Sequence, residues 1–472
     1  MLKFNRPLWD HQEHAWKRFQ TKHEMALIHD MGTGKTTTAI TWLRGKYSER
    51  REVFPTLIVS PVATLDGWCR EIKNNAAAHV LEKTAILYGK GEDRRKMLRD
   101  PGKQIFITNP ETFDMPTVVR GLVERNFDAI IVDEAHKFKN FKSKRLKQLL
   151  SVSDQTTLRA ILTGTPILNS YLDVWALWRI LDKGETFGTN FFVFRETYFR
   201  DENLAWKGKP NYFPSYVPKL GTDGVLATLM DRKASRVSKA ECLTLPPVVY
   251  SEEHTPMGAE QAKVYNAMEA ELIAEVRDGV CTATNALTRV LRLLQIVSGY
   301  ARIEDHSGVK MDYILKENPR LNRLHELLEE LTPKHKVVVW CVFEQNYHDV
   351  ARLAEDLKIG MATLTGLTKN RAEELRRFKE DPNCRLMVSN PQAGGAGVDG
   401  MQVAAYAIYL SRSFSLGDRL QSEARTNRGG SEIHENLFVI DLVTPGTIEE
   451  DVLSALKQKE DFSDAILERL KR

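Results

Sequence analysis

A glycine-rich turn between two regular segments constrains this chain more than any other feature. Residues 25–28 form an apolar run typical of a buried strand, and residues 31–36, Met-Gly-Thr-Gly-Lys-Thr, follow it at the start of a helical segment. Such a turn directs backbone N–H groups and the N-terminus of the helix towards phosphate oxygens. The sequence therefore predicts a phosphate-binding loop that contains Gly32, Thr33, Gly34, Lys35, Thr36 and Thr37.

A second segment supplies the acidic half of the same kind of site. Asp133 and Glu134 follow the apolar run of residues 129–132. Lys35 would place a mobile positive charge on the β- and γ-phosphates of a nucleotide, and the Thr36 hydroxyl can hold Mg²⁺. Asp133 is placed to reach the same metal, and Glu134 to orient and deprotonate an attacking water. A glycine turn of this length also arises by chance, but the two halves together predict nucleotide hydrolysis.

Strand-like apolar runs alternate with helical patterns in two separate blocks of the chain. Continuous apolar strands joined by helices indicate parallel sheets that are covered on both faces. Two such blocks predict an α/β fold with two parallel-sheet lobes, and 472 residues are too many for one hydrophobic core. The expected strands lie in residues 25–28, 57–60, 105–108, 130–133 and 161–163 of the first block and in residues 337–340, 386–389, 407–410 and 438–441 of the second.

The predicted organisation has three parts. Residues 1–183 form the first lobe, residues 184–319 an insertion and helical linker region, and residues 320–472 the second lobe. Within the middle part, residues 187–218 are crowded with aromatic side chains. These rings could stack on nucleic-acid bases, but the general tendency of aromatic side chains to be buried favours a satellite core.

Composition limits the class of protein and its partners. No apolar run approaches about 20 residues, so no membrane span is expected, and residues 1–7 lack the apolar core of a signal peptide. The five cysteines are scattered without a Cys-x-x-Cys pair, which indicates neither a disulfide framework nor a zinc site. We therefore expect a protein of a reducing cytosol. A net charge of only +4 permits nucleic-acid binding, through a local basic surface.

The second lobe shows no second phosphate loop, but two of its segments suit nucleotide chemistry. Residues 393–399 form a glycine-rich loop after a strand, able to approach a phosphate or a ribose. In residues 421–429, Arg425 and Arg428 stand three apart and share one face if the segment is helical. Two arginines near a helix end are most often solvated surface. Together with a phosphate loop in the first lobe, they instead predict groups that stabilise transition-state charge on a γ-phosphate.

Taken in order, these segments resemble the motifs of superfamily 2 helicases and, within them, of the Swi/Snf-type DNA-dependent ATPases. The resemblance runs nearly from end to end and continues outside the catalytic motifs, at residues 245–247, 291–296 and 447–467. The matching segments are residues 8–12 (the adenine-recognising glutamine motif), 29–36 (motif I), 57–61 (Ia), 107–112 (Ib), 133–140 (II), 162–169 (III), 336–343 (IV), 394–399 (V) and 421–429 (VI).

The resemblance implies two RecA-like lobes with ATP and Mg²⁺ in the cleft between them, and a brace helix in residues 447–472. It also assigns a role to individual side chains. These are Lys35, Asp133, Glu134, Arg425 and Arg428 for catalysis; Thr36 and Asp133 for Mg²⁺; Gln12, Gly397 and Asp399 with the phosphate loop for ATP; His136, Thr163, Thr165 and Gln421 for coupling; and Ser60, Thr108, Thr112, Gly394 and Gly395 for one nucleic-acid strand.

A basic run follows motif II, with Lys139 and Lys142 near its centre. It is open to two interpretations, a solvated face or a surface that tracks nucleic-acid phosphates. The chain also departs from the Swi/Snf pattern. His29 and Asp30 stand where that branch usually has Asp and Glu, and Asp399 stands where it usually has Asn. None of these departures removes a catalytic residue.

The sequence as a whole predicts an ATP-driven motor that moves along double-stranded or branched DNA. Contacts to phosphates imply little sequence preference. Two alternatives stay open, an RNA-dependent helicase and an ATP-gated nucleic-acid clamp without processive motion. A minimal motor of this kind is expected to act as a monomer in the cytoplasm of a bacterial or phage-infected cell, with replication or recombination proteins as candidate partners.

Overall fold

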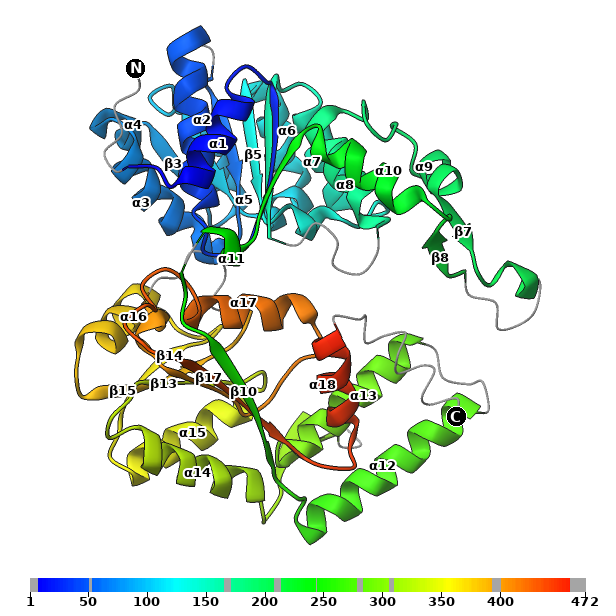
Figure 1. Cartoon of the computed structure of the whole chain (residues 1–472), viewed down its shortest axis with the longest axis vertical. Helices are drawn as coiled ribbons and strands as arrows, with labels where there is room; N and C mark the ends of the chain where they lie inside the picture. Colours follow the sequence, from blue (N-terminus) through cyan, green and yellow to red (C-terminus); the bar gives the residue numbers. More distant parts are fainter. Residues whose placement is uncertain are drawn as a thin grey trace. The chain divides into compact units, whose positions relative to one another are not determined.

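The computed structural model describes residues 7–50, 53–164, 171–207, 214–242, 244–277, 283–304, 310–392 and 400–458. The chain divides into two compact units, residues 1–243 (unit 1) and residues 244–472 (unit 2). Each unit is built around a parallel sheet with helices on its faces (Figure 1). This confirms the predicted α/β fold with two parallel-sheet lobes.

Unit 1 contains a sheet of seven parallel strands in the order β3-β4-β2-β5-β6-β1-β9. The five strands expected from apolar runs are all present, and β3 and β9 close the two edges of the sheet. The strands are β1 (Glu24–His29), β2 (Thr56–Val59), β3 (Thr84–Leu87), β4 (Ile105–Thr108), β5 (Ala129–Asp133), β6 (Leu158–Thr163) and β9 (Ala234–Val237).

Helices cover both faces of this sheet and bury two apolar cores. Successive residues of β5 serve opposite faces, since Ile130 belongs to one core and Ile131 to the other. This double burial explains why the central strands are mainly apolar. The helices are α1 (Asp10–Phe19), α2 (Lys35–Arg50), α3 (Leu65–Asn75), α4 (Ala78–Glu82), α5 (Gly91–Leu98), α6 (Pro116–Arg125), α7 (Lys144–Ser153), α8 (Asp173–Asp182), α9 (Phe191–Tyr198), α10 (Thr222–Asp231) and α11 (Lys239–Cys242).

The aromatic segment of unit 1 is largely a packing element. Phe187, Phe191, Phe194 and Phe199 are buried in the same apolar core as α8. The segment contains α9 and the antiparallel pair β7 (Phe199–Asp201) and β8 (Tyr216–Pro218). These rings are therefore buried, but in a main apolar core of unit 1 and not in a satellite core. Residues 208–213 lie outside the described part of the chain.

Unit 2 contains six parallel strands in the order β10-β17-β16-β13-β15-β14 and a separate antiparallel pair, β11 and β12. All four expected strands are present. The strands are β10 (Val248–His254), β11 (Tyr300–Glu304), β12 (Lys310–Ile314), β13 (Val337–Trp340), β14 (Gly360–Leu364), β15 (Cys384–Ser389), β16 (Tyr406–Tyr409) and β17 (Leu437–Val443). The helices are α12 (Ala259–Arg277), α13 (Ala283–Val297), α14 (Pro319–Leu331), α15 (Glu344–Asp356), α16 (Arg371–Glu380), α17 (Leu416–Thr426) and α18 (Ile448–Gln458).

The division of the chain differs from the three-part organisation expected from the sequence. β9 pairs with β1 of unit 1, and β10 pairs with β17 of unit 2. Residues 184–319 are therefore shared between the two units rather than forming a third. The segment expected to form a brace helix begins with α18, and residues 459–472 lie outside the described part of the chain.

Candidate functional site

The carboxyl ends of adjacent strands bring the predicted motif residues of unit 1 to one edge of its sheet. Ile28 of β1 lies opposite Thr163 of β6, and Val59 of β2 lies opposite Val132 of β5. The loops after these four strands therefore leave the sheet side by side. This edge is where ligands of open parallel sheets bind.

The loop between β1 and α2 has the backbone that its glycines allow. Gly32 and Gly34 have φ angles of +85° and +76°, a region that favours glycine. A Cβ atom at position 34 would lie 2.2 Å from Nε2 of Gln12, so a side chain there would also collide. Within the loop, the Lys35 ammonium donates to the carbonyl oxygens of His29 and Asp30 at 2.8 and 3.3 Å. The loop therefore holds a cation directly beside its backbone.

The predicted adenine-recognising residue braces this loop. Gln12 is buried, its Nε2 donates to the Gly34 carbonyl at 3.2 Å, and its Oε1 accepts from the Trp9 amide at 3.0 Å. Nε2 of His11 lies 2.8 Å from the carbonyl oxygen of Thr33. The start of α1 therefore fixes the phosphate loop, which is a positioning contribution that the sequence pattern alone did not indicate.

Asp133 is held at the end of β5 by two donors from the neighbouring segment. Its Oδ2 accepts from the Ser60 hydroxyl at 2.8 Å and from Nε1 of Trp68 at 3.0 Å. Burial, with the neighbouring Glu134 charge, raises the pKa of the Asp133 carboxyl despite these two donors. The contact of Trp68 with Asp133 therefore ties α3 to the end of β5.

Glu134 occupies a strained position directly after Asp133. Its φ angle is +49°, in the left-handed region, and its side chain is buried. Nδ1 of His136 lies 3.2 Å from Oε2 of Glu134 and 3.4 Å from the hydroxyl of Thr163. Burial opposes ionisation of Glu134, but His136, with Lys35 and Lys137, outweighs it and holds the pKa of this carboxyl below its usual value. His136 therefore joins motifs II and III directly.

The acidic groups at this edge suit a metal that brings its own further ligands. Within the described ranges, no group of three or more His, Cys, Asp or Glu side chains could hold a metal ion alone. Mg²⁺ commonly takes one or two carboxylates and completes its octahedron with water and substrate phosphates. One buried carboxylate, Asp133, and the Thr36 hydroxyl at the start of α2 fit that requirement.

The two departures in motif I link the phosphate loop to the last strand of the sheet. Nε2 of His29 lies 2.9 Å from the Ser235 hydroxyl of β9. Burial, with the charges of Lys35 and His11, lowers the pKa of His29 to about 3, so the ring is neutral at physiological pH. Oδ2 of Asp30 accepts from the backbone amide of Lys239, the first residue of α11, at 2.9 Å. These residues tie the loop to the segment that leads out of unit 1.

The hydroxyls expected to touch a nucleic-acid strand are engaged inside unit 1. Ser60, Thr108 and Thr112 are all buried. Oγ1 of Thr108 lies 2.6 Å from Oγ1 of Thr112, and Arg94 of α5 donates to the Thr112 hydroxyl. These side chains shape the loops after β2 and β4. The backbone amides of Ser60 and Thr112 are engaged as well, with the carbonyl oxygens of Thr108 and Asn109.

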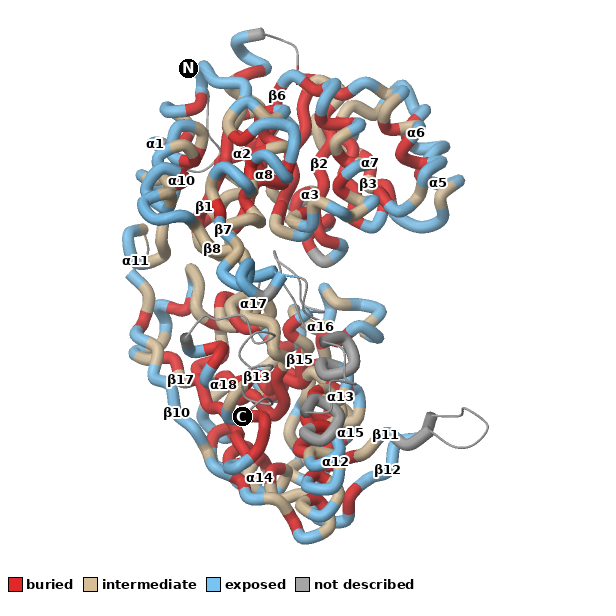
Figure 2. Tube along the Cα trace, turned by 90° about the vertical axis from the view of Figure 1, so that its right-hand side faces the viewer, coloured by how far each residue is buried: buried red, intermediate tan, exposed pale blue. Residues whose placement is uncertain are grey.

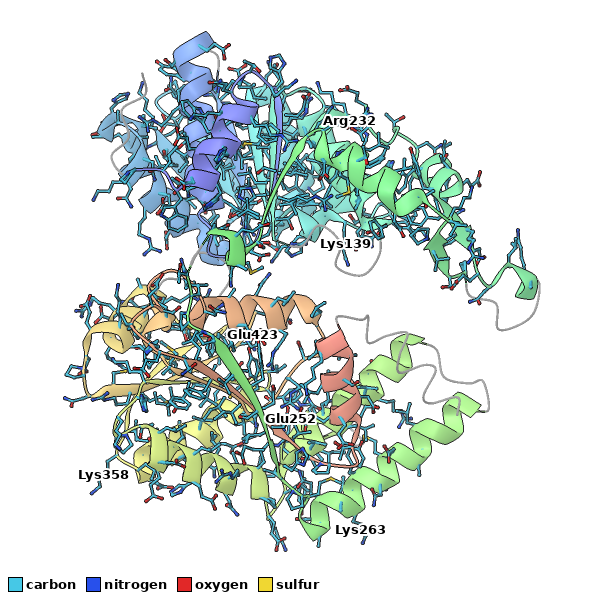
Figure 3. All side chains as sticks on the ribbon, viewed as in Figure 1. Lys139, Arg232, Glu252, Lys263, Lys358 and Glu423 are labelled. Carbon is cyan, nitrogen blue, oxygen red and sulfur yellow. The ribbon has the colours of Figure 1, made fainter. Side chains whose placement is uncertain are left out.

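The basic run after motif II is divided by its partners. Lys139 (Figure 3) forms an ion pair with Asp173 of α8 at 3.1 Å, and Arg145 pairs with Asp114. Lys142 and Lys144 are exposed and form no ion pair with the part of the chain that the structure describes. The ion pairs of Lys139 and Arg145 stabilise the fold locally. Lys142 and Lys144 present their charges to solvent.

In unit 2, helix α17 carries a buried arginine with unused donors. Arg425 donates to the Pro391 carbonyl at 3.3 Å, and its guanidinium lies 5.8 Å from the centre of the Trp340 ring. Its Nε and Nη1 atoms are buried and have no hydrogen-bond partner among the described residues. Burial, with the nearby Arg428 charge, lowers the pKa of Arg425 to about 9. Arg428 and Gln421 are half-buried.

A buried ionic network holds α17 against the rest of unit 2. Arg419 of α17 makes two bonds to Asp441 of β17, at 2.7 and 2.9 Å. Nη2 of Arg412, which precedes α17, lies 3.3 Å from the same carboxylate, and its Nη1 lies 2.8 Å from Glu449 of α18. Sequence reasoning missed this network, because no motif contains its members together.

Several predicted site residues lie outside the described part of the chain. They are Thr165, Gly394, Gly395, Gly397 and Asp399. Their roles stay predictions. No helix within the described residues is long and apolar enough to cross a membrane.

Comparison with known proteins identifies relatives along nearly the whole chain. The family described as SNF2-related domain matches residues 11–302. The uncharacterized ATP-dependent helicase MG018 of Mycoplasma genitalium is 24% identical over 92% of this chain and 39% of its own length. Protein p41 of Acyrthosiphon pisum secondary endosymbiont phage 1 is 23% identical over 94% of each chain. Human chromodomain-helicase-DNA-binding protein 1 is 24% identical over 97% of this chain, which spans 26% of it.

Solved structures include one similar chain of comparable extent. The SWI2/SNF2 ATPase core of Sulfolobus solfataricus, solved in complex with dsDNA, matches with a TM-score of 0.45 and 22% identity. The match covers 100% of this chain and 96% of that one.

Proposed function

The chain belongs to the SNF2-related domain family and is an ATP-dependent enzyme of the helicase type, and from that premise we propose that it hydrolyses ATP to move along duplex or branched DNA. One observation carries the proposal. The phosphate loop, the Asp133–Glu134 pair and Thr163 meet at one sheet edge, and His136 contacts both Glu134 and Thr163. A change at the phosphates can therefore reach the loop after β6 through one side chain.

The residues of unit 1 divide the work of hydrolysis. Lys35 and the N-terminal amides of α2 bind the phosphates. On binding, the phosphate oxygens replace the carbonyl oxygens of His29 and Asp30 as partners of the Lys35 ammonium. Thr36 and Asp133 would hold Mg²⁺, which supplies charge neutralisation on the phosphates when bound. Glu134, kept ionised by its surroundings, accepts a proton from the attacking water.

Unit 2 supplies the groups that stabilise the charge of the transition state. The unused Nε and Nη1 donors of Arg425 suit an anionic group such as a phosphate oxygen. Arg428 adds a second guanidinium at the end of α17. Binding and release of that anion in each ATP cycle would drive the conformational change on which stepping depends.

DNA is the proposed track because the family includes a chromodomain-helicase-DNA-binding protein among the relatives of this chain. Exposed Lys142 and Lys144 lie close in sequence to the loop after β5 and can follow phosphates. The remaining backbone amides of the loops after β2 and β4 are the other proposed contacts, since the hydroxyls of these loops are engaged internally. Such contacts carry little base preference.

Two substitutions at the unit 1 site are expected to separate binding from chemistry. Glu134→Gln should lower ATP turnover by about 10²–10⁴-fold and keep ATP affinity, because the amide cannot accept the proton of water. Lys35→Ala should weaken ATP binding, because it removes the charge on the phosphates. Steady-state phosphate release and titration with a fluorescent nucleotide measure the two effects. Near-normal turnover in Glu134→Gln would place the general base elsewhere.

A double substitution in the basic run tests the track. Lys142→Gln/Lys144→Gln should raise the DNA concentration that half-maximally stimulates ATPase activity and spare the basal rate. The slope of log affinity against log salt should fall by about 2, one for each lost phosphate contact. Lys263→Gln/Lys334→Gln, two exposed lysines of unit 2, is the charge-matched control. Equal behaviour of both doubles would make the run a solvated face.

The nature of the nucleic acid is settled by parallel stimulation with duplex DNA, single strands, forks, four-way junctions and RNA at one salt concentration. Stronger stimulation by DNA supports the proposal. Equal or stronger stimulation by RNA would replace it with an RNA-dependent helicase. Binding to DNA without any stimulated turnover would indicate an ATP-gated clamp.

A further inference from the structure

A groove on the outer surface of unit 1 is lined by arginines that the proposed mechanism does not use. It lies between α5 and α6, which pack side by side (Figure 2), and has a volume of about 280 Å³. Four arginines and a single carboxylate, Glu124, contribute to its lining. The four are Arg95 of α5, Arg99 directly after that helix, and Arg120 and Arg125 of α6.

Three of these arginines have no partner inside the protein. Arg95, Arg99 and Arg120 are exposed and make no side-chain hydrogen bond or ion pair with the described residues. By contrast, Arg145 of α7 forms an ion pair with a carboxylate, that of Asp114. Guanidinium groups gathered around one concavity repel one another, so an unbalanced cluster of this kind favours a multivalent anion.

The fourth arginine is fixed in place with a donor left over. Arg125 donates through Nη2 to the Lys103 carbonyl at 3.1 Å, and its guanidinium lies 5.4 Å from the centre of the Phe106 ring. Its Nε atom is buried without a hydrogen-bond partner in the described part of the chain. A buried, unsatisfied donor is costly unless a ligand completes it. The fixed guanidinium of Arg125 adds a fourth positive charge to the groove lining.

The shape and lining of the groove specify the class of anion. No aromatic ring lines it, so nothing there would stack on a base or a nucleoside. The lining residues of α6 run from Thr117 to Arg125, a helical rise of about 12 Å. Guanidinium forks match phosphate oxygens in geometry as well as charge. We propose that this groove binds successive phosphate groups of an extended polyanion.

One contact connects the groove with the edge that carries the motifs. Arg94, the neighbour of Arg95 on α5, donates to the Gly89 carbonyl at 3.0 Å and to Oδ1 of Asn109 at 2.9 Å. The helix that forms one wall of the groove therefore also holds the loop after β4. Phosphates in the groove would be bound next to the proposed strand contacts of that loop. A nucleic-acid source of the phosphates rests on the proposed function, whereas a free polyphosphate does not.

The test compares the full chain with Arg95→Gln/Arg99→Gln/Arg120→Gln. A control of equal charge change is Arg232→Gln/Lys263→Gln/Lys334→Gln, at exposed positions away from the groove (Figure 3 labels the first two). Binding of a labelled single strand, a labelled duplex, inorganic tripolyphosphate and polyglutamate is measured across salt concentrations. Melting temperature is recorded for each variant, and the three exposed side chains should leave it unchanged.

We expect the groove variant, and not the control, to lose at least tenfold in affinity for a phosphate polymer, with a salt slope lower by two to three units. Loss confined to the nucleic acids identifies a backbone site, and loss with tripolyphosphate identifies a free polyphosphate site. Unchanged affinity, equal loss in the control, or equally tight polyglutamate binding would overturn the proposal. If wild type binds tripolyphosphate through the groove but no nucleic acid stimulates its ATPase, the proposed function fails and the groove site stands.

Discussion

Replacement of Arg425 by glutamine is expected to cut ATP turnover by about 10³–10⁵-fold, the range for arginines that stabilise a transferring phosphoryl group. ATP affinity should change little, because the lost contact acts mainly in the transition state. The physical reason lies in the buried Nε and Nη1 donors of Arg425, which the described residues leave without partners. Single-turnover and steady-state rates with saturating ATP and DNA measure the effect.

The same substitution should stabilise the protein in the absence of nucleotide. Burial holds the pKa of Arg425 to about 9, below that of an arginine in the unfolded chain, so the folded state carries an unfavourable charge at every pH below 9. The penalty would fade only as the pH rises above 9. Arg425→Gln should therefore raise the melting temperature by a few degrees, equally at pH 6 and pH 8.

Two further variants make this prediction specific. Arg425→Lys keeps the charge but lacks the planar fork, and we expect it to restore little turnover. Arg428→Gln should also lower turnover, at a site that is only half-buried, with a smaller gain in stability. Normal turnover in Arg425→Gln, or a fall in its melting temperature, would show that this arginine is a structural element of α17.

The strands that the sequence revealed are those buried on both faces. β13 is apolar at every position, and β2, β4 and β5 are apolar except for one end residue each, Thr56, Thr108 and Asp133. The side chains of all four strands are buried throughout. The sequence did not predict β3 and β14, because buried and partly exposed residues alternate along them. It did not predict β10, because most residues of that strand face solvent. Strands at the edge of a sheet carry a weaker apolar signal than central ones. The division at residue 243 depends on the sheets that the edge strands β9 and β10 join.

At the candidate site, the sequence revealed the groups that act and missed many that hold them. Motif spacing predicted Lys35, Asp133 and Glu134 as parts of one site, and the strand register brings the segments after β1 and β5 to the same edge of the sheet. The spacing gave no indication that Trp68 and Ser60 bind Asp133, or that Gln12 braces the Gly34 carbonyl. These contacts join segments far apart in the chain, and no local pattern records them. The resemblance predicted that the hydroxyls of Thr108 and Thr112 contact a nucleic-acid strand, and it did not indicate that both are buried.

The buried ionic network of unit 2 gives the prediction with the largest effect on stability. Glu449, in the first turn of α18, is buried between two arginines. Its carboxylate accepts from Nη1 of Arg320 at 2.9 Å, lies 2.8 Å from Nη1 of Arg412, and accepts the Thr444 amide at 3.0 Å. Burial opposes its ionisation, but the two arginine charges outweigh it and lower its pKa. Its contribution to stability is therefore complete near neutral pH and is lost as the pH falls through that lowered value.

Glu449→Gln should destabilise the chain by about 3–5 kcal/mol, because two buried guanidinium groups lose their counter-charge. For a unit of this size the melting temperature should fall by roughly 6–20 °C, measured by calorimetry at pH 7. Glu450→Gln, the exposed neighbour, is the matched control and should change stability by no more than about 0.5 kcal/mol.

A paired variant tests whether the charge itself or the shape of the network matters. Arg320→Met/Glu449→Met replaces the pair by apolar groups of similar size, while Arg412 keeps Asp441 as its partner. Such replacements are often neutral or stabilising, so most of the lost stability should return. ATP turnover of the double variant should be lower than that of wild type if Glu449 positions α17 through Arg412 and Asp441. It should equal that of wild type if Glu449 has no such role. A melting temperature for Glu449→Gln within 1 °C of wild type would contradict the network as a whole.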